Sequence, residues 1–111
     1  MNIIFDIEPI PKGRPRFTRF GGVYTPPMTR AYESTIAYMA RQYFKKPLEG
    51  DVRLTITFRV KRMADLDNLV KAVTDALNGI VYNDDRQIVE IHAFRIKDKL
   101  HPCVECKIEE V

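Results

Sequence analysis

At 111 residues and 12.9 kDa, the chain has the length of one ordinary domain, and 45% hydrophobic residues suffice for a packed core. It lacks any run near the ~20 apolar residues of a membrane helix and starts without a secretory signal pattern, so we expect a cytoplasmic protein with no membrane segment. The net charge is +3, but residues 12–62 carry twelve Lys or Arg and three Asp or Glu, a local balance of +9 that leaves −6 for the rest. Such a division suits a protein that holds a polyanion against metal ions, although unevenly distributed surface charge is the alternative.

The first half of the chain predicts a strand, a loop and a helix. Residues 2–8 place Ile3, Phe5 and Ile7 on one side of a half-buried strand. The segment PIPKGRPRFTRFGGVYTPP is rich in Pro and Gly, which predicts an exposed loop with a small hairpin around Gly21-Gly22. Apolar residues then recur at helical spacing from about Thr25 or Thr29 to Phe44, with threonine caps and prolines at the entrance.

The second half predicts a strand, a helix and two further strands. The run DVRLTITFRVK alternates cleanly, with Arg53, Arg59 and Lys61 outward, so this face is either open to a phosphate backbone or simply solvated. Residues 66–79 form a second helix with Gly79 at its C-terminal cap. After the turn YNDDRQ, residues 88–97 and 103–110 are predicted strands. We therefore expect an α+β fold with a small mixed sheet of about four main strands and two helices, in one domain over 1–111.

The two cysteines, Cys103 and Cys106, have the C-x-x-C spacing of redox and zinc motifs. They fall in a predicted strand, however, where positions three apart point to opposite faces, and Cys106 is in step with the apolar Val104 and Ile108. With no second Cys or His pair available for zinc, the pattern favours core packing.

The acidic residues around the second helix are the main candidates for chemistry. Asp65 and Asp67 flank Leu66 at the start of that helix, where they act either as a cap and a charge on the helix dipole or as paired oxygen ligands. Asp84 and Asp85 follow the same helix. Because the helix is about 20 Å long at ~1.5 Å per residue, the chain must return toward its start for Asp85 to meet Asp67.

If three carboxylates converge, their repulsion favours a bound divalent cation. Oxygen ligands without His or thiolate favour Mg²⁺ or Mn²⁺ over zinc. Lys71 lies four residues after Asp67, either in an ordinary surface ion pair or as a cation that stabilises a phosphoryl transition state.

The motifs PKGRPRF, YTPPMTRAYE and ADLDNLVKAVTDALNGIVYNDDRQIVEI, in this order and in so short a chain, resemble those of the RusA family of Holliday junction resolvases. The DLDN-x-x-K-x-x-x-D-A-L-N-G run followed by the DD turn is a specific pattern. The resemblance implies a RusA-like fold and a phage- or prophage-associated homodimer that nicks four-way junctions symmetrically with Mg²⁺ or Mn²⁺, in DNA recombination and repair.

Carried over by position, the resemblance implies that Asp65, Asp67 and Asp85 are the essential carboxylates and metal ligands and that Lys71 is the catalytic lysine. Asp84 would support the third ligand. Arg14 and Arg16 resemble the family's DNA-contacting segment, with Lys12 and Arg19 beside them and Arg59 and Lys61 as further phosphate contacts. Ala64 departs from the proline of many relatives, and the loop before the DD turn is a residue shorter than in some.

These residues suggest metal-assisted attack of water on a phosphodiester, leaving 5′ phosphate and 3′ hydroxyl ends. Two other functions fit the pattern less fully. One is a non-catalytic DNA-binding dimer whose acids are caps and turn residues, and the other is a metal nuclease that prefers flaps or single strands.

Overall fold

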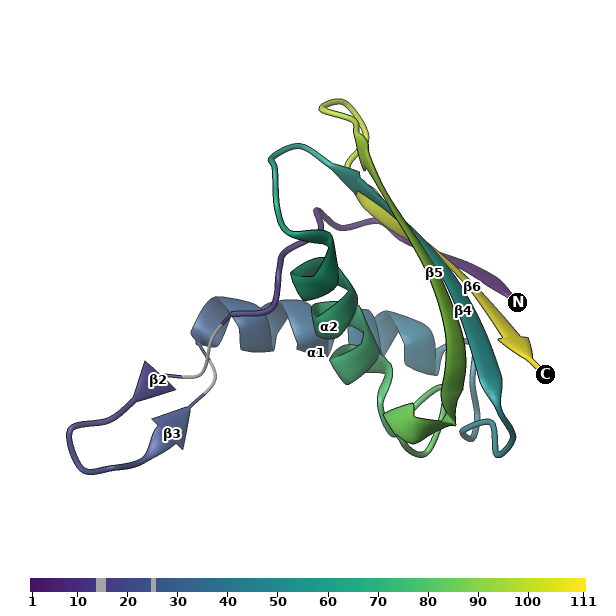
Figure 1. Ribbon diagram of the computed structural model, residues 1–111, viewed down its shortest axis with the longest axis horizontal. Coiled ribbons are helices and arrows are strands. Elements are labelled where there is room, and N and C mark those ends of the chain that lie inside the picture. Colours follow the sequence, from purple (N-terminus) through teal and green to yellow (C-terminus); the bar gives the residue numbers. More distant parts are fainter. Residues whose placement is uncertain (14–15, 25) are drawn as a thin grey trace.

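The computed structural model describes residues 1–13, 16–24 and 26–111 and has two layers, a sheet and a pair of helices. The elements in chain order are β1 Asn2–Phe5, β2 Arg16–Phe17, β3 Val23–Tyr24, α1 Pro27–Arg41, β4 Val52–Val60, α2 Leu66–Leu77, the 3-10 turn η1 Asp85–Gln87, β5 Ile88–Lys97 and β6 Cys103–Glu110. Four strands form one mixed sheet in the order β1-β6-β4-β5. Both helices cover the same face of it (Figure 1), which confirms the predicted α+β class.

The core lies between this sheet and the helices. Alternation along β4 sends Leu54, Ile56 and Phe58 to the helix side, where all three are fully buried. Each helix packs against this face of the sheet through a stripe of apolar residues at helical spacing. The stripe of α1 is Tyr32, Ile36 and Ala40, and that of α2 is Leu69, Ala72, Val73, Ala76 and Leu77. These stripes fix which side of each helix is left for chemistry.

The first strand and the first helix are shorter than predicted. The strand stops at Phe5, where the Ile7 N–H donates to the Phe5 carbonyl at 2.8 Å and turns the chain. α1 begins after Pro26, and Thr25 lies outside the described residues. Thr29, predicted as a cap, is instead buried within the first turn and accepts a hydrogen bond from the Gly13 N–H at 3.1 Å. It thus ties the proline-rich segment to the helix.

Other predicted elements agree closely with the structure. β5 and β6 have the predicted bounds, and β2 and β3 pair as the small hairpin. Gly79 follows the C-cap Asn78 with a φ of 81°, which only glycine adopts readily. Cys106 is buried, and burial raises the pKa of its thiol to about 12, so its predicted core role is confirmed. Within the described ranges, no helix is long and apolar enough to cross a membrane.

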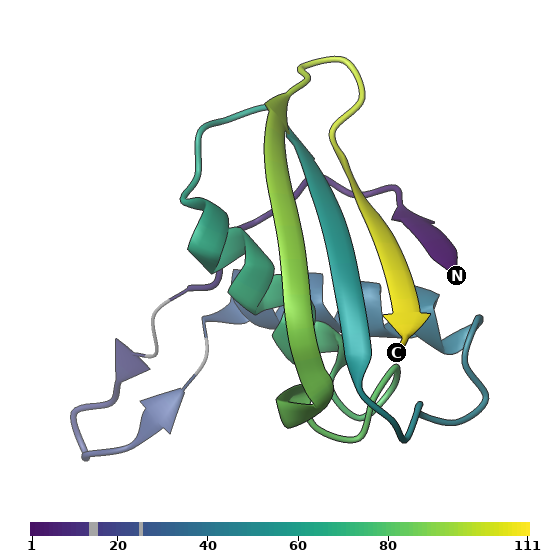
Figure 2. The ribbon, with the colours of Figure 1, turned by 45° about the vertical axis from the view of Figure 1, so that its right-hand side comes forward.

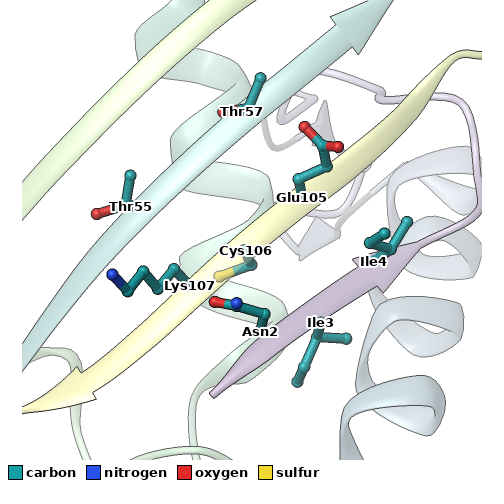
Figure 3. Close-up of a pocket in the computed structure, with 8 residues that line it drawn as sticks. All are labelled: Asn2, Ile3, Ile4, Thr55, Thr57, Glu105, Cys106 and Lys107. Atoms are coloured by element: carbon teal, nitrogen blue, oxygen red, sulfur yellow. The ribbon is translucent and has the colours of Figure 1, made fainter.

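The face of the sheet turned away from the helices, called the open face below, is bare of helices in Figure 2. The sequence left the cations of this face either as phosphate contacts or as solvated charges, and the structure shows that neighbouring strands supply matching acids for Arg53 and Arg59. Arg53 Nε lies 2.6 Å from Glu90 Oε2, and Arg59 Nε lies 3.3 Å from Glu105 Oε2. The shallow hollow on this face is lined by residues of β1, β4 and β6 such as Thr55, Thr57 and Lys107 (Figure 3). The open face is therefore charge-balanced rather than basic.

Candidate active site

The positions of the predicted acids follow from the connection between β4 and β5. β4 and β5 are parallel, paired from Val52↔Ile88 to Val60↔Lys97, so both begin at the same end of the sheet. Between them α2 must return the chain from the end of β4 to the start of β5. Asp65 and Asp67 thus lie where α2 begins, near the end of the sheet at which β4 finishes, and Asp85 lies directly before β5, at the end of the sheet where β4 and β5 begin. Figures 1 and 2 show α2 running between these two ends of the sheet.

Asp65 and Asp67 are exposed at the first turn of α2. Asp65 occupies the N-cap position, but its side chain makes no capping hydrogen bond in the described helix. Among the residues that the structure describes, the one hydrogen bond to the Asp67 carboxylate is local, from the Asn68 N–H to its Oδ1 at 2.9 Å. Leu66 between them packs against the core, as predicted. The capping explanation for Asp65 therefore lacks its defining bond, and both carboxylates keep oxygens directed to solvent.

Asp84 and Asp85 differ sharply although they are adjacent. Asp84 is the N-cap of η1, where its Oδ1 accepts from the Arg86 N–H at 2.9 Å and the Gln87 side chain accepts from the Asp84 N–H at 3.0 Å. The pKa of Asp84 is lowered, first by the Arg86 backbone N–H and then by the side chains of Asp85 and Arg86. Asp85 follows as an exposed residue of the same turn. Asp84 is thus occupied by capping, while Asp85 is presented to solvent.

The η1 turn is held in place from two sides. Gln87 Nε2 donates to the Leu48 carbonyl at 2.8 Å and to the Gly50 carbonyl at 2.9 Å, which ties the turn to the loop before β4. The Tyr82 hydroxyl donates to the Thr74 carbonyl of α2 at 2.6 Å. The turn that carries Asp85 is therefore anchored to the loop before β4, and the segment that leads into the turn is anchored to α2.

One chain does not bring the three predicted ligands together. Within residues 1–13, 16–24 and 26–111, no group of three His, Cys, Asp or Glu side chains is close enough to hold a metal ion. A helix of twelve residues spans about 18 Å at ~1.5 Å per residue, which is the scale of the separation along α2. Asp65 and Asp67 are grouped, and Asp85 stands apart from them.

Lys71 lies one turn after Asp67 on α2, but its ion-pair partner is Asp75, one turn further along the helix. Its Nζ is 3.2 Å from Asp75 Oδ1. The second oxygen of Asp75 is 3.2 Å from Lys12 Nζ, which also lies 2.6 Å from Glu33 Oε2. Burial alone would lower the pKa of Lys12, but its hydrogen bonds to Glu33 and Asp75 outweigh this and raise it. The ammonium of Lys71, 57% exposed in its side chain, is thus steered by Asp75 without being covered.

The residues predicted to contact DNA differ in their exposure and in their ion-pair partners. The Lys12 N–H donates to the Asn68 carbonyl at 2.9 Å, so the basic segment starts beside the first turn of α2. Arg19 is exposed in the hairpin and Lys61 is exposed directly after β4, whereas Arg59 is held by Glu105 and by Asp98 at 3.6 Å. Arg14 and the side chain of Arg16 lie outside the described residues.

Sequence reasoning missed two residues near the site. Asp75 joins Lys12 to Lys71, as described above. Arg95 lies opposite Phe58 on the helix side of β5, and its guanidinium donates to the Ala64 carbonyl, one residue before Asp65. A charged residue at an inward position of a strand was the available signal. Arg95 fixes the segment that leads into α2.

A mixed sheet backed by two helices, with carboxylates and a lysine exposed on α2 and Lys12 held beside that helix, defines a small α+β protein with residues suited to phosphodiester chemistry. The family model described as Endodeoxyribonuclease RusA matches residues 6–109. The chain therefore belongs to the RusA family and is an endodeoxyribonuclease.

Two relatives span most of the chain. An uncharacterized protein named YqaN from Bacillus subtilis (strain 168) is 30% identical over 131 aligned positions, covering 94% of this chain and 92% of the relative. A protein named crossover junction endodeoxyribonuclease RusA from Aquifex aeolicus (strain VF5) is 29% identical over 97 positions, covering 82% of this chain and 76% of the relative. The similarity thus extends over nearly the whole fold.

Proposed function

We propose that this endodeoxyribonuclease resolves four-way DNA junctions in recombination and repair, as a Mg²⁺-dependent homodimer that makes paired symmetric nicks. The observation that carries the site is the pair Asp65 and Asp67, exposed at the start of α2 without the capping bond that would explain Asp65 structurally. The similarity to a relative named as a crossover junction enzyme supports the choice of DNA substrate.

The outer edge of β5 supports the homodimer. β5 is the last strand in the sheet order and has ten residues, and no described strand pairs with its outer side. Natural sheets protect such edges by shortness or charge, yet four large apolar residues of β5 are between 42% and 56% exposed. They are Val89, Ile91, Phe94 and Ile96. A second copy paired along this edge would cover the backbone and the apolar side chains together.

Antiparallel pairing of two β5 strands also accounts for the separated carboxylates. A two-fold axis near the middle of β5 would set the Ile88 end of one strand beside the Lys97 end of the other. Lys97 lies level with Val60, where the chain leaves the sheet toward Asp65. Asp85 of each copy would thereby approach Asp65 and Asp67 of its partner. The metal site would then be complete only in the dimer.

The donor set fits a hard cation, because three aspartates offer oxygen ligands and the Cys106 thiol is buried on another element. A bound Mg²⁺ would supply a water of lowered pKa and charge stabilisation at the phosphate, as Mn²⁺ also would. Asp65, Asp67 and Asp85 would hold the ion, and Lys71 would face the scissile phosphate from one turn along α2. Asp75 orients the Lys71 ammonium, and the products would be 5′ phosphate and 3′ hydroxyl ends.

The basic segment would hold the junction arms. Lys12 is fixed beside α2, and Arg14, Arg16, Arg19 and Lys61 extend the positive charge along the chain. Phosphate contacts position a protein on DNA without reading its sequence. Arg59 would contribute only after release from Glu105 and Asp98, so we place Lys61 ahead of it.

The test compares cleavage of a four-way junction, a flap and a linear duplex of equal length, with Mg²⁺ and with chelator. We expect paired nicks in the junction, little cleavage of the duplex and none in chelator. Preferred cleavage of the flap would replace junction resolution by flap cleavage, and equal cleavage in chelator would remove the metal from the mechanism.

A further inference from the structure

The β2–β3 hairpin projects from the body of the protein in both ribbon views (Figures 1 and 2). Its tip is fixed by its own hydrogen bonds. The Thr18 N–H donates to the Gly22 carbonyl at 2.7 Å, and the Thr18 hydroxyl accepts from the Gly22 N–H at 2.9 Å. Gly21 supplies the φ of 85° that the turn requires. The tip is thus a defined structure, although it packs on little else.

Aromatic side chains on this hairpin are unusually open to solvent. Phe20 at the tip is 90% exposed, and Phe17 is 78% exposed. Tyr24 is 39% exposed. The Arg19 guanidinium lies over the Phe20 ring, 5.9 Å from its centroid, within cation–π range. Exposed rings gathered on a projecting turn indicate a contact surface.

The charge around the hairpin indicates what it contacts. Residues 9–32 contain five cations and no Asp or Glu. Aromatic rings interleaved with cations suit nucleic acid, because rings stack on base faces while cations meet phosphates. A fully paired duplex hides its base faces, whereas a branch point or an opened end exposes them. The hairpin therefore matches unpaired bases better than a duplex arm.

We propose that Phe20, with Arg19 stacked against it, inserts at the branch point and stacks on an unpaired base. This inference rests on the proposed junction substrate and adds the contact that distinguishes a branch from a duplex. Phe17, on the same hairpin, provides a second ring for the neighbouring base.

A fluorescence experiment tests the stacking directly, because the protein contains no Trp. Phe20→Trp places a single indole at the tip, and Tyr38→Trp is the matched control on the exposed surface of α1, where Tyr38 is 66% exposed. In chelator, we expect a four-way junction to quench the Phe20→Trp emission strongly and a duplex of equal length to quench it weakly. The Tyr38→Trp emission should stay constant. Equal quenching of both variants, or none for Phe20→Trp, would overturn the inference.

Binding of two further variants separates stacking from general apolar contact. Phe20→Ala and Phe20→Leu should each bind the junction about tenfold more weakly, with duplex binding changed less than about twofold. Full junction binding by Phe20→Leu would mean that apolar area suffices, which contradicts stacking. If wild type cleaves junctions but the tip stays unquenched, only the hairpin inference fails. If junctions and single strands quench it but no junction is cleaved, only the proposed function fails.

Discussion

The acidic residues at the two ends of α2 differ in whether their side chains form capping hydrogen bonds. At its start, Asp65 and Asp67 are exposed, and neither closes a cap across the helix turn. Beside its end, Asp84 closes a capping box around η1, and Asp85 next to it is exposed. One end thus holds two carboxylates available as ligands, and the other holds one structural acid and one available acid. This difference explains why Asp85, and not Asp84, would be the metal ligand from the Asp84-Asp85 pair.

The separation of the exposed acids along α2 bears on how two copies would assemble. Within one chain, Asp85 is separated from Asp65 and Asp67 by about the length of α2. The outer edge of β5, with its exposed apolar side chains, extends from the level of Asp85 to the level of Asp65. Two-fold pairing of two β5 edges would place the start of one β5 beside the end of the other, and would thereby bring Asp85 of each copy near Asp65 and Asp67 of the other copy.

Asp67→Asn should have the largest effect. The side chain keeps its size but loses a ligand charge, so we expect junction cleavage in Mg²⁺ to fall by several orders of magnitude while junction binding in chelator is retained. Asp6→Asn is the matched control, since Asp6 is exposed directly after β1, at the sheet edge opposite β5. Undiminished cleavage by Asp67→Asn would remove the start of α2 from the metal site.

Lys71→Ala should come next, with cleavage reduced about 100-fold or more and junction binding nearly unchanged, as for loss of one electrostatic group at a transition state. Single-turnover cleavage and a separate binding titration measure the two quantities. Lys45→Ala, an exposed lysine after α1, should match wild type in both. A purely binding defect in Lys71→Ala would make Lys71 a DNA contact instead.

Lys61→Ala should weaken junction binding modestly and make its salt dependence shallower, by ~0.9 in the slope of log K against log salt if it meets one phosphate. Arg59→Ala is the comparison, because Arg59 is already paired with Glu105 and Asp98. We expect its slope to match wild type. An unchanged slope in Lys61→Ala would place the DNA elsewhere.

Asp84→Asn should have the smallest effect, a fall of no more than a few degrees in Tm with cleavage largely retained, because asparagine caps a helix nearly as well as aspartate and only the carboxylate charge is lost. Because the folded-state pKa of Asp84 lies below its usual value of 3.8, its stabilisation is present above that pH and is lost as the pH falls through the lower folded pKa.

The sequence predicted the elements well wherever side chains alternate or recur with a clear period. The bounds of β5 and β6 agree with the structure, and α2 begins at Leu66 as predicted, although it ends at Leu77, two residues before the predicted end at Gly79. Periodicity did not predict the shortened first strand, because the turn after Phe5 depends on a local backbone bond. It also missed the acids that neutralise Arg53 and Arg59, since these come from strands far along the chain.

The separation of Asp85 from Asp67 could have been predicted by a topological argument. Two strands joined through one helix are parallel, so the acid before the second strand lies at the starting end of the first. Spacing along the chain cannot supply that information. The choice between Asp84 and Asp85 needed side-chain geometry, because both fit the sequence pattern equally.

Complementation between two inactive variants tests the shared site most directly. Asp67→Asn and Asp85→Asn are each purified, mixed under conditions that exchange subunits, and assayed for nicking of a four-way junction in Mg²⁺. If Asp85 acts with Asp65 and Asp67 of its partner, each mixed dimer has one complete site, so the mixture should nick one strand although neither variant does so alone. A mixture that exchanges subunits and stays as inactive as its components would contradict a site built from two chains.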